Sequence, residues 1–237
     1  MMWNGSWASC LPETMLRVHP IRTWMSNAYL VENETGLYLV DACAPGSHNQ
    51  ILQKIDELGK ELKLIVITHA HFDHYGSAGA IRRVTQARIA IHSADAPAMA
   101  RGQPPIRSAH GRGRFTLPFL PLMNSVSRPL KTDADVILEG DSRLDGFGLP
   151  ARVLHTPGHT AGSICLLVDD PQGGLLAFTG DLVTAGREPA LQRLYADDWV
   201  EMARSLARLQ AAQPGQVYCG HGSRPIPGEV FQQIKAE

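Results

Sequence analysis

Residues 62–68, LKLIVIT, form a nearly continuous apolar run of strand length that ends directly in HAHFDH, residues 69–74. Such a run is typical of a strand covered on both faces, as in the parallel sheets of α/β proteins. The polar segment behind it places three histidines and an aspartate within six positions. Because α/β sheets carry their functional sites at the carboxyl ends of strands, we expect a buried strand that delivers a polar site at its end.

The surrounding pattern alternates strands and helices. Residues 28–33 and 37–43 are apolar, β-branched or aromatic runs joined at Gly36, which predicts a hairpin. Ser47 is a plausible N-cap for a helix that ends at Gly59. We further predict a second helix from near Asp73 through residues 77–85 and a strand over 87–92.

The second half contains further strands and helices. The patterns predict strands over 151–156, 163–169, 174–181 and 216–222, and helices over 197–212 and 228–236. Residues 102–131, rich in Pro, Gly, Arg and Ser, show no period and are interpreted as a lid or substrate-recognition insertion. No stretch resembles a linker, so we predict one domain over residues 1–237.

Composition narrows the class of protein. The 237 residues carry a formal net charge of −1, which gives no basic field for nucleic acid or anionic lipid. The N-terminus lacks a signal-peptide pattern, and no apolar run is long enough to span a membrane. Four widely spaced cysteines are typical of buried thiols in a reducing compartment. These features predict a soluble cytoplasmic protein acting on a small molecule.

Further candidate ligands follow other predicted strands. His159, Asp181 and His221 each lie at or soon after a strand end and beside glycine, which permits sharp turns and close backbone approach. Imidazole and carboxylate together suit zinc, iron or manganese. A single histidine at a strand end is usually an ordinary surface or core residue, but the repetition of this setting favours a metal centre.

HAHFDH, followed in order by HTPGHTAGS, TGD and GHG, resembles the metallo-β-lactamase superfamily over residues 27–223. The resemblance implies an α/β fold: a four-layer αβ/βα sandwich of two mixed β-sheets with outer helices. It also implies two divalent metal ions, with zinc expected and iron or manganese as alternatives. The first ion would take His69, His71 and His159, the second Asp73, His74 and His221, and Asp181 would bridge them.

The implied activity is that of a binuclear hydrolase that uses a metal-bridging hydroxide as nucleophile. Asp73 is the candidate catalytic residue, since its carboxylate can accept a proton from the nucleophile. Asp41, at another strand end, is the candidate for orienting a ligand, with a simple turn or cap role as the alternative.

The resemblance also bears on the substrate. True metallo-β-lactamases usually have Cys or Ser where this chain has Asp181, which is more similar to the glyoxalase II, lactonase and phosphodiesterase branches. We therefore expect an ester, lactone or thioester of a small molecule. The alternatives are a phosphodiester, a β-lactam, oxidoreductase chemistry at a non-haem iron centre, or a non-catalytic binding protein.

Candidate substrate-binding residues lie in two regions. The predicted lid interleaves arginines with apolar residues, which suits an acidic, partly apolar substrate or, alternatively, a solvated mobile loop. Its apolar segment 117–123 could line an acyl pocket or form a homodimer contact. The candidates are Arg112, Arg114 and Phe119 in the lid, and Thr184, Arg187 and Tyr195 after Asp181.

Overall fold

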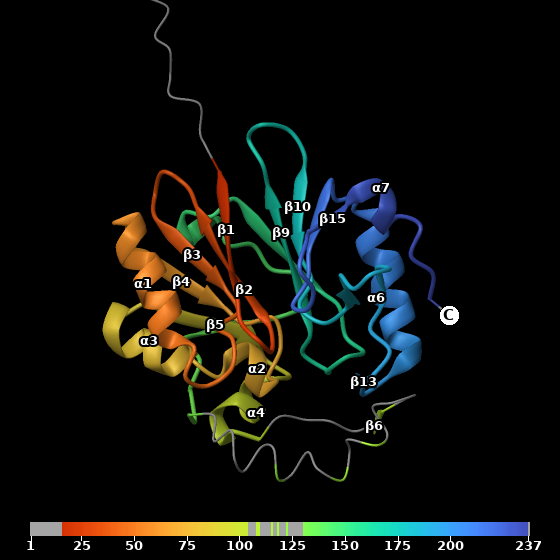
Figure 1. The fold of residues 1–237 in the computed structure, drawn as a ribbon, viewed down its shortest axis with the longest axis horizontal. Helices are drawn as coiled ribbons and strands as arrows, with labels where there is room; N and C mark the ends of the chain where they lie inside the picture. The colour runs from red at the N-terminus through yellow and green to blue at the C-terminus, as the bar shows by residue number, and fades with distance from the viewer. Residues whose placement is uncertain are drawn as a thin grey trace, which may run out of the picture.

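The computed structural model describes residues 16–103, 108–109, 115, 118, 122 and 130–236, and its strands form two mixed sheets packed face to face (Figure 1). The first sheet has the order β1-β2-β3-β4-β5-β7, and the second has the order β15-β14-β10-β9-β8. β11 pairs with β12, and β6 pairs with β13, as separate short ribbons. The strands are β1 (Arg17–Arg22), β2 (Asn27–Glu32), β3 (Leu37–Val40), β4 (Leu62–Val66), β5 (Arg88–His92), β6 (Ser108–Ala109), β7 (Val136–Leu138), β8 (Ala151–His155), β9 (Ile164–Asp169), β10 (Leu175–Phe178), β11 (Val183–Thr184), β12 (Ala190–Leu191), β13 (Tyr195–Ala196), β14 (Gln216–Tyr218) and β15 (Ile226–Pro227).

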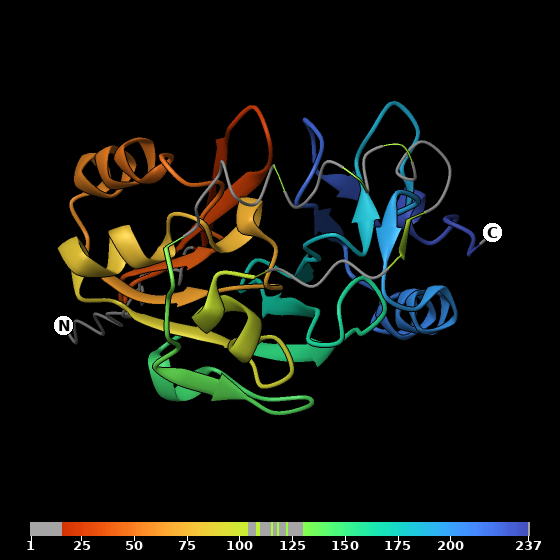
Figure 2. The same cartoon turned by 90° about the horizontal axis from the view of Figure 1, so that it is seen from below.

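Helices cover the two outer faces of this pair of sheets. In the view from below, the helices lie on the outer sides and the sheets between them (Figure 2). The expected four-layer αβ/βα sandwich is confirmed. The first sheet is covered by α1 (His48–Leu58), α3 (Ala78–Thr85) and α4 (Ala96–Arg101), the second by α6 (Trp199–Ala211) and α7 (Gly228–Phe231), while α2 (Phe72–Tyr75) and the 3-10 helix η3 (Asp145–Phe147) are short connecting turns.

Three apolar layers hold the sandwich together, and the period of two along a strand explains how β3 serves two of them. Leu37 and Leu39 pack towards the helices of the first sheet, whereas Tyr38 and Val40 face the second sheet. The third layer lies between the second sheet and α6 and α7. Every residue of β3 is buried, so the strand has no solvent face.

The nearly continuous apolar run that predicted a doubly covered strand is β4. It pairs in parallel with β3 on one side and β5 on the other. Its side chains alternate between the layers, with Ile65 towards the helices and Leu64 and Val66 between the sheets. The polar segment that follows therefore leaves a strand that is fixed on both faces and both edges.

Two local expectations need correction. The helix predicted from near Asp73 through residue 85 is two helices, α2 and α3, because contacts with a distant loop interrupt it. A Cβ on Gly76 would lie 2.4 Å from Pro45 Cδ, and the Ser77 hydroxyl donates to the Ala44 carbonyl at 2.7 Å. Ser47 precedes α1 but makes no side-chain cap hydrogen bond, whereas Gly59 ends that helix in the left-handed conformation as expected.

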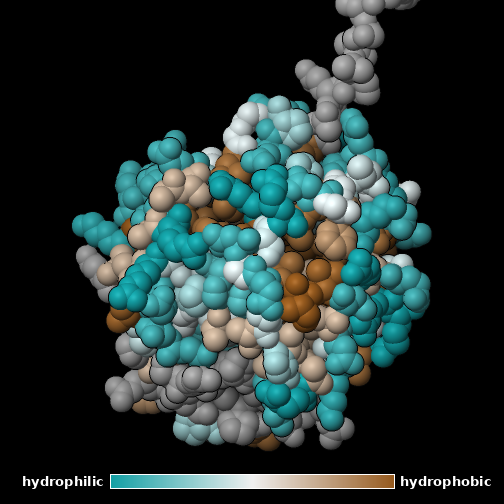
Figure 3. All heavy atoms as spheres, turned by 180° about the vertical axis from the view of Figure 1, so that it is seen from behind, coloured by the Kyte–Doolittle hydropathy of each residue, from teal (hydrophilic) through white to brown (hydrophobic). Residues whose placement is uncertain are grey.

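Other general features concern the surface and the thiols. Cys43, Cys165 and Cys219 are buried and free, whereas Cys10 lies outside the described residues. In the described part of the chain, no helix combines the length and apolar character that crossing a membrane requires. The rear face is largely hydrophilic, with an apolar patch near its middle (Figure 3). The predicted lid lies mostly outside the described residues.

Candidate metal centre

The HAHFDH segment turns from the end of β4 into α2. His69 and His71 precede the helix and His74 lies within it, and all three side chains are buried. The turn is anchored from both sides: Ile67 N donates to the Ala90 carbonyl, and Ala42 N donates to the His74 carbonyl. Three imidazoles therefore occupy fixed positions at one edge of the first sheet.

The remaining predicted ligands come from the second sheet. His159 lies in the β8–β9 loop, while Asp181 and His221 follow β10 and β14 closely. Their glycine neighbours allow close approach: a Cβ on Gly220 would lie 2.5 Å from His74 Cε1 and 2.7 Å from Asp181 Oδ1. Position 220 therefore requires glycine, because a larger side chain would overlap His74 and Asp181.

The structure brings all seven predicted side chains together in two adjoining groups. His69, His71, His159 and Asp181 offer donor atoms within 4.8 Å of one another, and so do Asp73, His74 and His221. Asp181 lies between the groups. Its carboxylate oxygens are 3.4 Å from His159 Nε2, 3.3 Å from His74 Nε2 and 3.2 Å from His221 Nε2.

Hydrogen bonds behind the centre fix how three of the rings point. His159 Nδ1 donates to the Tyr195 carbonyl, and His221 Nδ1 donates to the Met25 carbonyl, each at 2.8 Å. His74 Nδ1 donates to Asp41 Oδ2 at 2.8 Å. Because Nδ1 is used in each bond, Nε2 is the nitrogen that faces the centre, and in the deprotonated ring its lone pair is available to a metal ion.

Asp41 holds His74 in place while its backbone adopts the left-handed region, with φ of 57°. Asp and Asn tolerate that conformation better than most residues. Its carboxylate also accepts from the Thr68 backbone N–H at 2.8 Å and from the Thr68 hydroxyl. Asp41 therefore connects β3, the start of the HAHFDH loop and a ring of the centre.

Asp95 is a structural element of the centre that the sequence reasoning missed. It is buried, and its carboxylate accepts three hydrogen bonds of 2.8 Å, from Ala70 N, Thr160 Oγ1 and Gly162 N. Ala70 separates two of the histidines, and Thr160 adjoins His159. Asp95 thus joins the two loops that supply the first group. A sequence signal existed, since Asp95 follows shortly after β5.

We predict that Asp95→Asn lowers the free energy of unfolding by about 1–3 kcal/mol, because the amide presents NH₂ to a buried backbone N–H. Metal affinity should fall as well, since the two loops lose their shared anchor. Urea denaturation of the metal-free protein and a chelator competition measure the two effects. Asp133→Asn, at an exposed position, is the control. Wild-type stability and metal retention in Asp95→Asn would contradict the assignment.

Burial and charge set the protonation of the first group. Burial and the neighbouring histidines hold the pKa of His69 well below its usual range, and burial with His71 lowers the pKa of His159 to about 3. Burial alone would raise the pKa of Asp181, but His221 and His74 outweigh it and keep that pKa well below normal. His69 and His159 are thus neutral imidazoles, and Asp181 is an ionised carboxylate.

The second group attracts positive charge. Burial opposes protonation of His74, but Asp181, Asp41 and Asp73 raise its pKa well above normal. Asp181 raises the pKa of His221 to about 9 against the effect of burial. The carboxylates of Asp41, Asp73 and Asp181 therefore share a largely buried volume. A cation bound there would stabilise them, since an uncompensated buried charge is costly.

These residues fit a metal site on grounds of geometry. His69 Nε2, His74 Nε2 and Asp181 Oδ1 are buried with no hydrogen-bond partner among the described residues. The 3.2–3.4 Å separations around Asp181 are close to the roughly 3.3 Å expected between two donors on one tetrahedral zinc ion. His71 Nδ1 and His159 Nε2 lie 3.0 Å apart in the same arrangement.

A cavity of about 500 Å³ opens directly onto the centre. Thr184 and Tyr195, two of the predicted substrate residues, line it together with Asp73 and Asp181. Tyr195 belongs to β13, which pairs with β6 from the predicted lid. Arg112, Arg114 and Phe119 lie outside the described residues.

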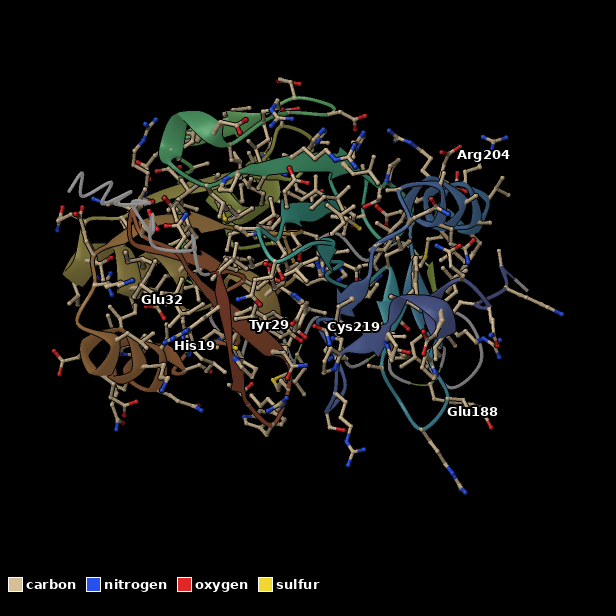
Figure 4. The ribbon with its side chains drawn as sticks, turned by 90° about the horizontal axis from the view of Figure 1, so that it is seen from above. His19, Tyr29, Glu32, Glu188, Arg204 and Cys219 are labelled. Atoms are coloured by element: carbon tan, nitrogen blue, oxygen red, sulfur yellow. The ribbon has the colours of Figure 1, made fainter. Side chains whose placement is uncertain are left out.

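Arg187 is not placed in the cavity. It lies exposed in the turn between β11 and β12, next to Glu188, which points away from the molecule in Figure 4. Among the described residues, the arginine that lines the cavity is Arg193, which the sequence reasoning did not single out. Proximity to Asp181 in the sequence therefore does not determine which side chain faces the centre.

An αβ/βα sandwich with two adjoining His/Asp groups at one edge defines a class of metal-dependent hydrolases. The sequence profile of the metallo-beta-lactamase superfamily matches residues 21–221. The chain belongs to the metallo-beta-lactamase superfamily.

Two curated relatives illustrate the range of similarity. YobT of Bacillus subtilis (strain 168), named as uncharacterized, is 29% identical over 208 residues, covering 83% of this chain and 82% of that protein. A hydroxyacylglutathione hydrolase of Cupriavidus taiwanensis is 30% identical over 211 residues, covering 87% and 67% respectively. The chain thus spans about two thirds of the length of that hydrolase.

Solved structures show the same fold. TTHA1623 in a di-iron-bound form has a TM-score of 0.69 and 26% identity, covering 92% of this chain and 98% of that one. The subclass B3 metallo-beta-lactamase BJP-1 of Bradyrhizobium japonicum has a TM-score of 0.65 and 20% identity, covering 92% and 86%. The second similarity concerns the fold alone.

Proposed function

We propose that the chain hydrolyses an ester, thioester or lactone bond of a small molecule with two divalent ions. His69, His71 and His159 would hold one ion, Asp73, His74 and His221 the other, and Asp181 would touch both. The observation that carries the proposal is the position of Asp181, which lies within 3.4 Å of a histidine from each group. TTHA1623, described as di-iron-bound, supports a two-ion site in a similar fold.

Divalent ions held by these residues would lower the pKa of bound water towards neutrality and would polarise the substrate carbonyl. The chain contributes position and proton transfer. Asp73 lies on the cavity wall, 3.6 Å from His221 Nε2, so its carboxylate can accept the proton of the attacking water. The Tyr195, Met25 and Asp41 oxygens hold three imidazoles in orientation, so little reorganisation accompanies the reaction.

The choice of bond is supported by relatives rather than by geometry. Matching proteins are named hydroxyacylglutathione hydrolase, and another is named a probable polyketide biosynthesis zinc-dependent hydrolase. An aspartate at position 181, rather than Cys or Ser, also favours this branch over true β-lactamases.

Elemental analysis of the purified protein, followed by a substrate panel on the same sample, tests the proposal. We expect about two equivalents of divalent metal per chain and metal-dependent cleavage of esters, thioesters or lactones. Cleavage confined to phosphodiesters or β-lactams would contradict the proposed bond class. Bound iron with substrate-dependent oxygen uptake and no hydrolysis would indicate an oxidoreductase instead.

A further inference from the structure

The cavity beside the centre has an apolar wall built from three separate parts of the chain. Ala190, Leu191 and Leu194 come from the segment between β12 and β13 and its flanks. Phe72 comes from the start of α2, and Met25 comes from the turn between β1 and β2. Hydrocarbon therefore lines the cavity both from the side of the first sheet and from the segment around β12.

The polar groups carried by this wall are largely engaged within the protein. Gln192 is buried, and its Oε1 accepts from Arg193 N at 2.7 Å and from Leu194 N at 2.8 Å. The Met25 and Tyr195 carbonyls accept from His221 and His159. What the wall presents to a ligand is therefore mostly side-chain carbon, with Thr184, Arg193 and Tyr195 as its polar members.

The described lining residues offer few cations to a strongly anionic ligand. Arg193 is the one lysine or arginine among the described lining residues, and it is exposed. Asp73 and Asp181 lie on the side of the centre. Among the described residues of this wall, a phosphate-bearing ligand would face one cation, whereas an apolar group would cover Leu194, which is 43% exposed.

From this lining we infer that the substrate carries an uncharged aliphatic or aromatic group beside the scissile ester or thioester bond, bound against Met25, Phe72, Leu191 and Leu194. The inference rests on the proposed hydrolase function. It narrows that function to hydrophobic acyl compounds, because each methylene moved from water onto this wall stabilises the bound state.

A series of 4-nitrophenyl esters with acetyl, butanoyl and hexanoyl groups tests the inference on metal-loaded protein. We expect kcat/KM to rise roughly two- to fourfold per added methylene until the cavity is filled. A non-hydrolysable 4-nitrophenyl hexyl ether should bind more tightly than the ethyl ether in calorimetry. The ether measurement detects the apolar wall without depending on turnover.

Leu194→Asn should weaken the dependence on chain length in both the ester series and the ether series. The ratio of kcat/KM for the hexanoyl ester to that for the acetyl ester should fall at least about fivefold. Val230→Asn is the matched control, since Val230 is an exposed apolar residue on α7 outside the cavity. Metal-dependent hydrolysis without any chain-length preference would overturn the inference and leave the proposed function standing. No metal-dependent cleavage of any ester, thioester or lactone would instead overturn the proposed function itself.

Discussion

Replacing Asp181 by alanine is expected to lower kcat/KM at least about a thousandfold, or about 4 kcal/mol of transition-state stabilisation. The carboxylate is 6% exposed and approaches a histidine of each group, so its loss removes the donor that the proposed function places between the two ions. Metal content should fall in the same variant. Steady-state kinetics on a cleaved ester and elemental analysis of the same preparation measure the two losses.

Asp169→Ala is the matched control, because Asp169 is an exposed aspartate at the end of β9. It should retain wild-type metal content and activity. His71→Ala should behave like Asp181→Ala, since it removes a buried donor from the first group. Full hydrolytic activity in a metal-free double variant at positions 71 and 181 would refute a metal-dependent mechanism.

The part of the fold that the sequence predicted depends on local periodicity. β4 is apolar at nearly every position because it is covered on both faces, and that pattern is visible without any knowledge of its neighbours. HAHFDH follows it within three residues, so the position of the cluster at a strand end was predictable too. His159, Asp181 and His221 converge on the same edge because each also follows a strand.

What the sequence did not predict depends on contacts between distant segments. The break between α2 and α3 is imposed by Pro45 and Ala44, some thirty residues earlier. Asp95 follows a strand as the candidate ligands do, but its importance appears only when Ala70 and Thr160 lie beside it. No single-segment pattern contains either relationship.

The lining of the cavity also depends on contacts that the local sequence does not show. Arg187 is nearer than Arg193 to Asp181 in sequence, yet the path of the β11–β12 turn exposes it while Arg193 lines the cavity. His92 and His155 form a stacked pair, with ring centroids 4.0 Å apart, and do not belong to the ligand groups. Motifs predicted which side chains cluster, whereas the lining of the cavity depends on loop geometry.

Asp41→Asn is expected to weaken metal binding about 10- to 100-fold, the usual cost of losing a partner behind a metal-binding histidine. Asparagine tolerates the left-handed backbone at φ of 57°, so the variant changes charge and hydrogen bonding with little added strain. In the variant, the side-chain oxygen can accept a hydrogen bond from His74 or from Thr68 N. The NH₂ group takes the place of the second carboxylate oxygen, so it meets one of the other donors that now bond to the carboxylate.

Chelator competition at a fixed pH measures the affinity, and kinetics at limiting and saturating metal separate binding from chemistry. Activity should fall mainly at limiting metal and recover substantially when metal is in excess, because Asp41 touches His74 rather than the substrate cavity. Asp56→Asn on the exposed face of α1 is the control. An unchanged affinity in Asp41→Asn would show that the His74 ring is held by its packing alone.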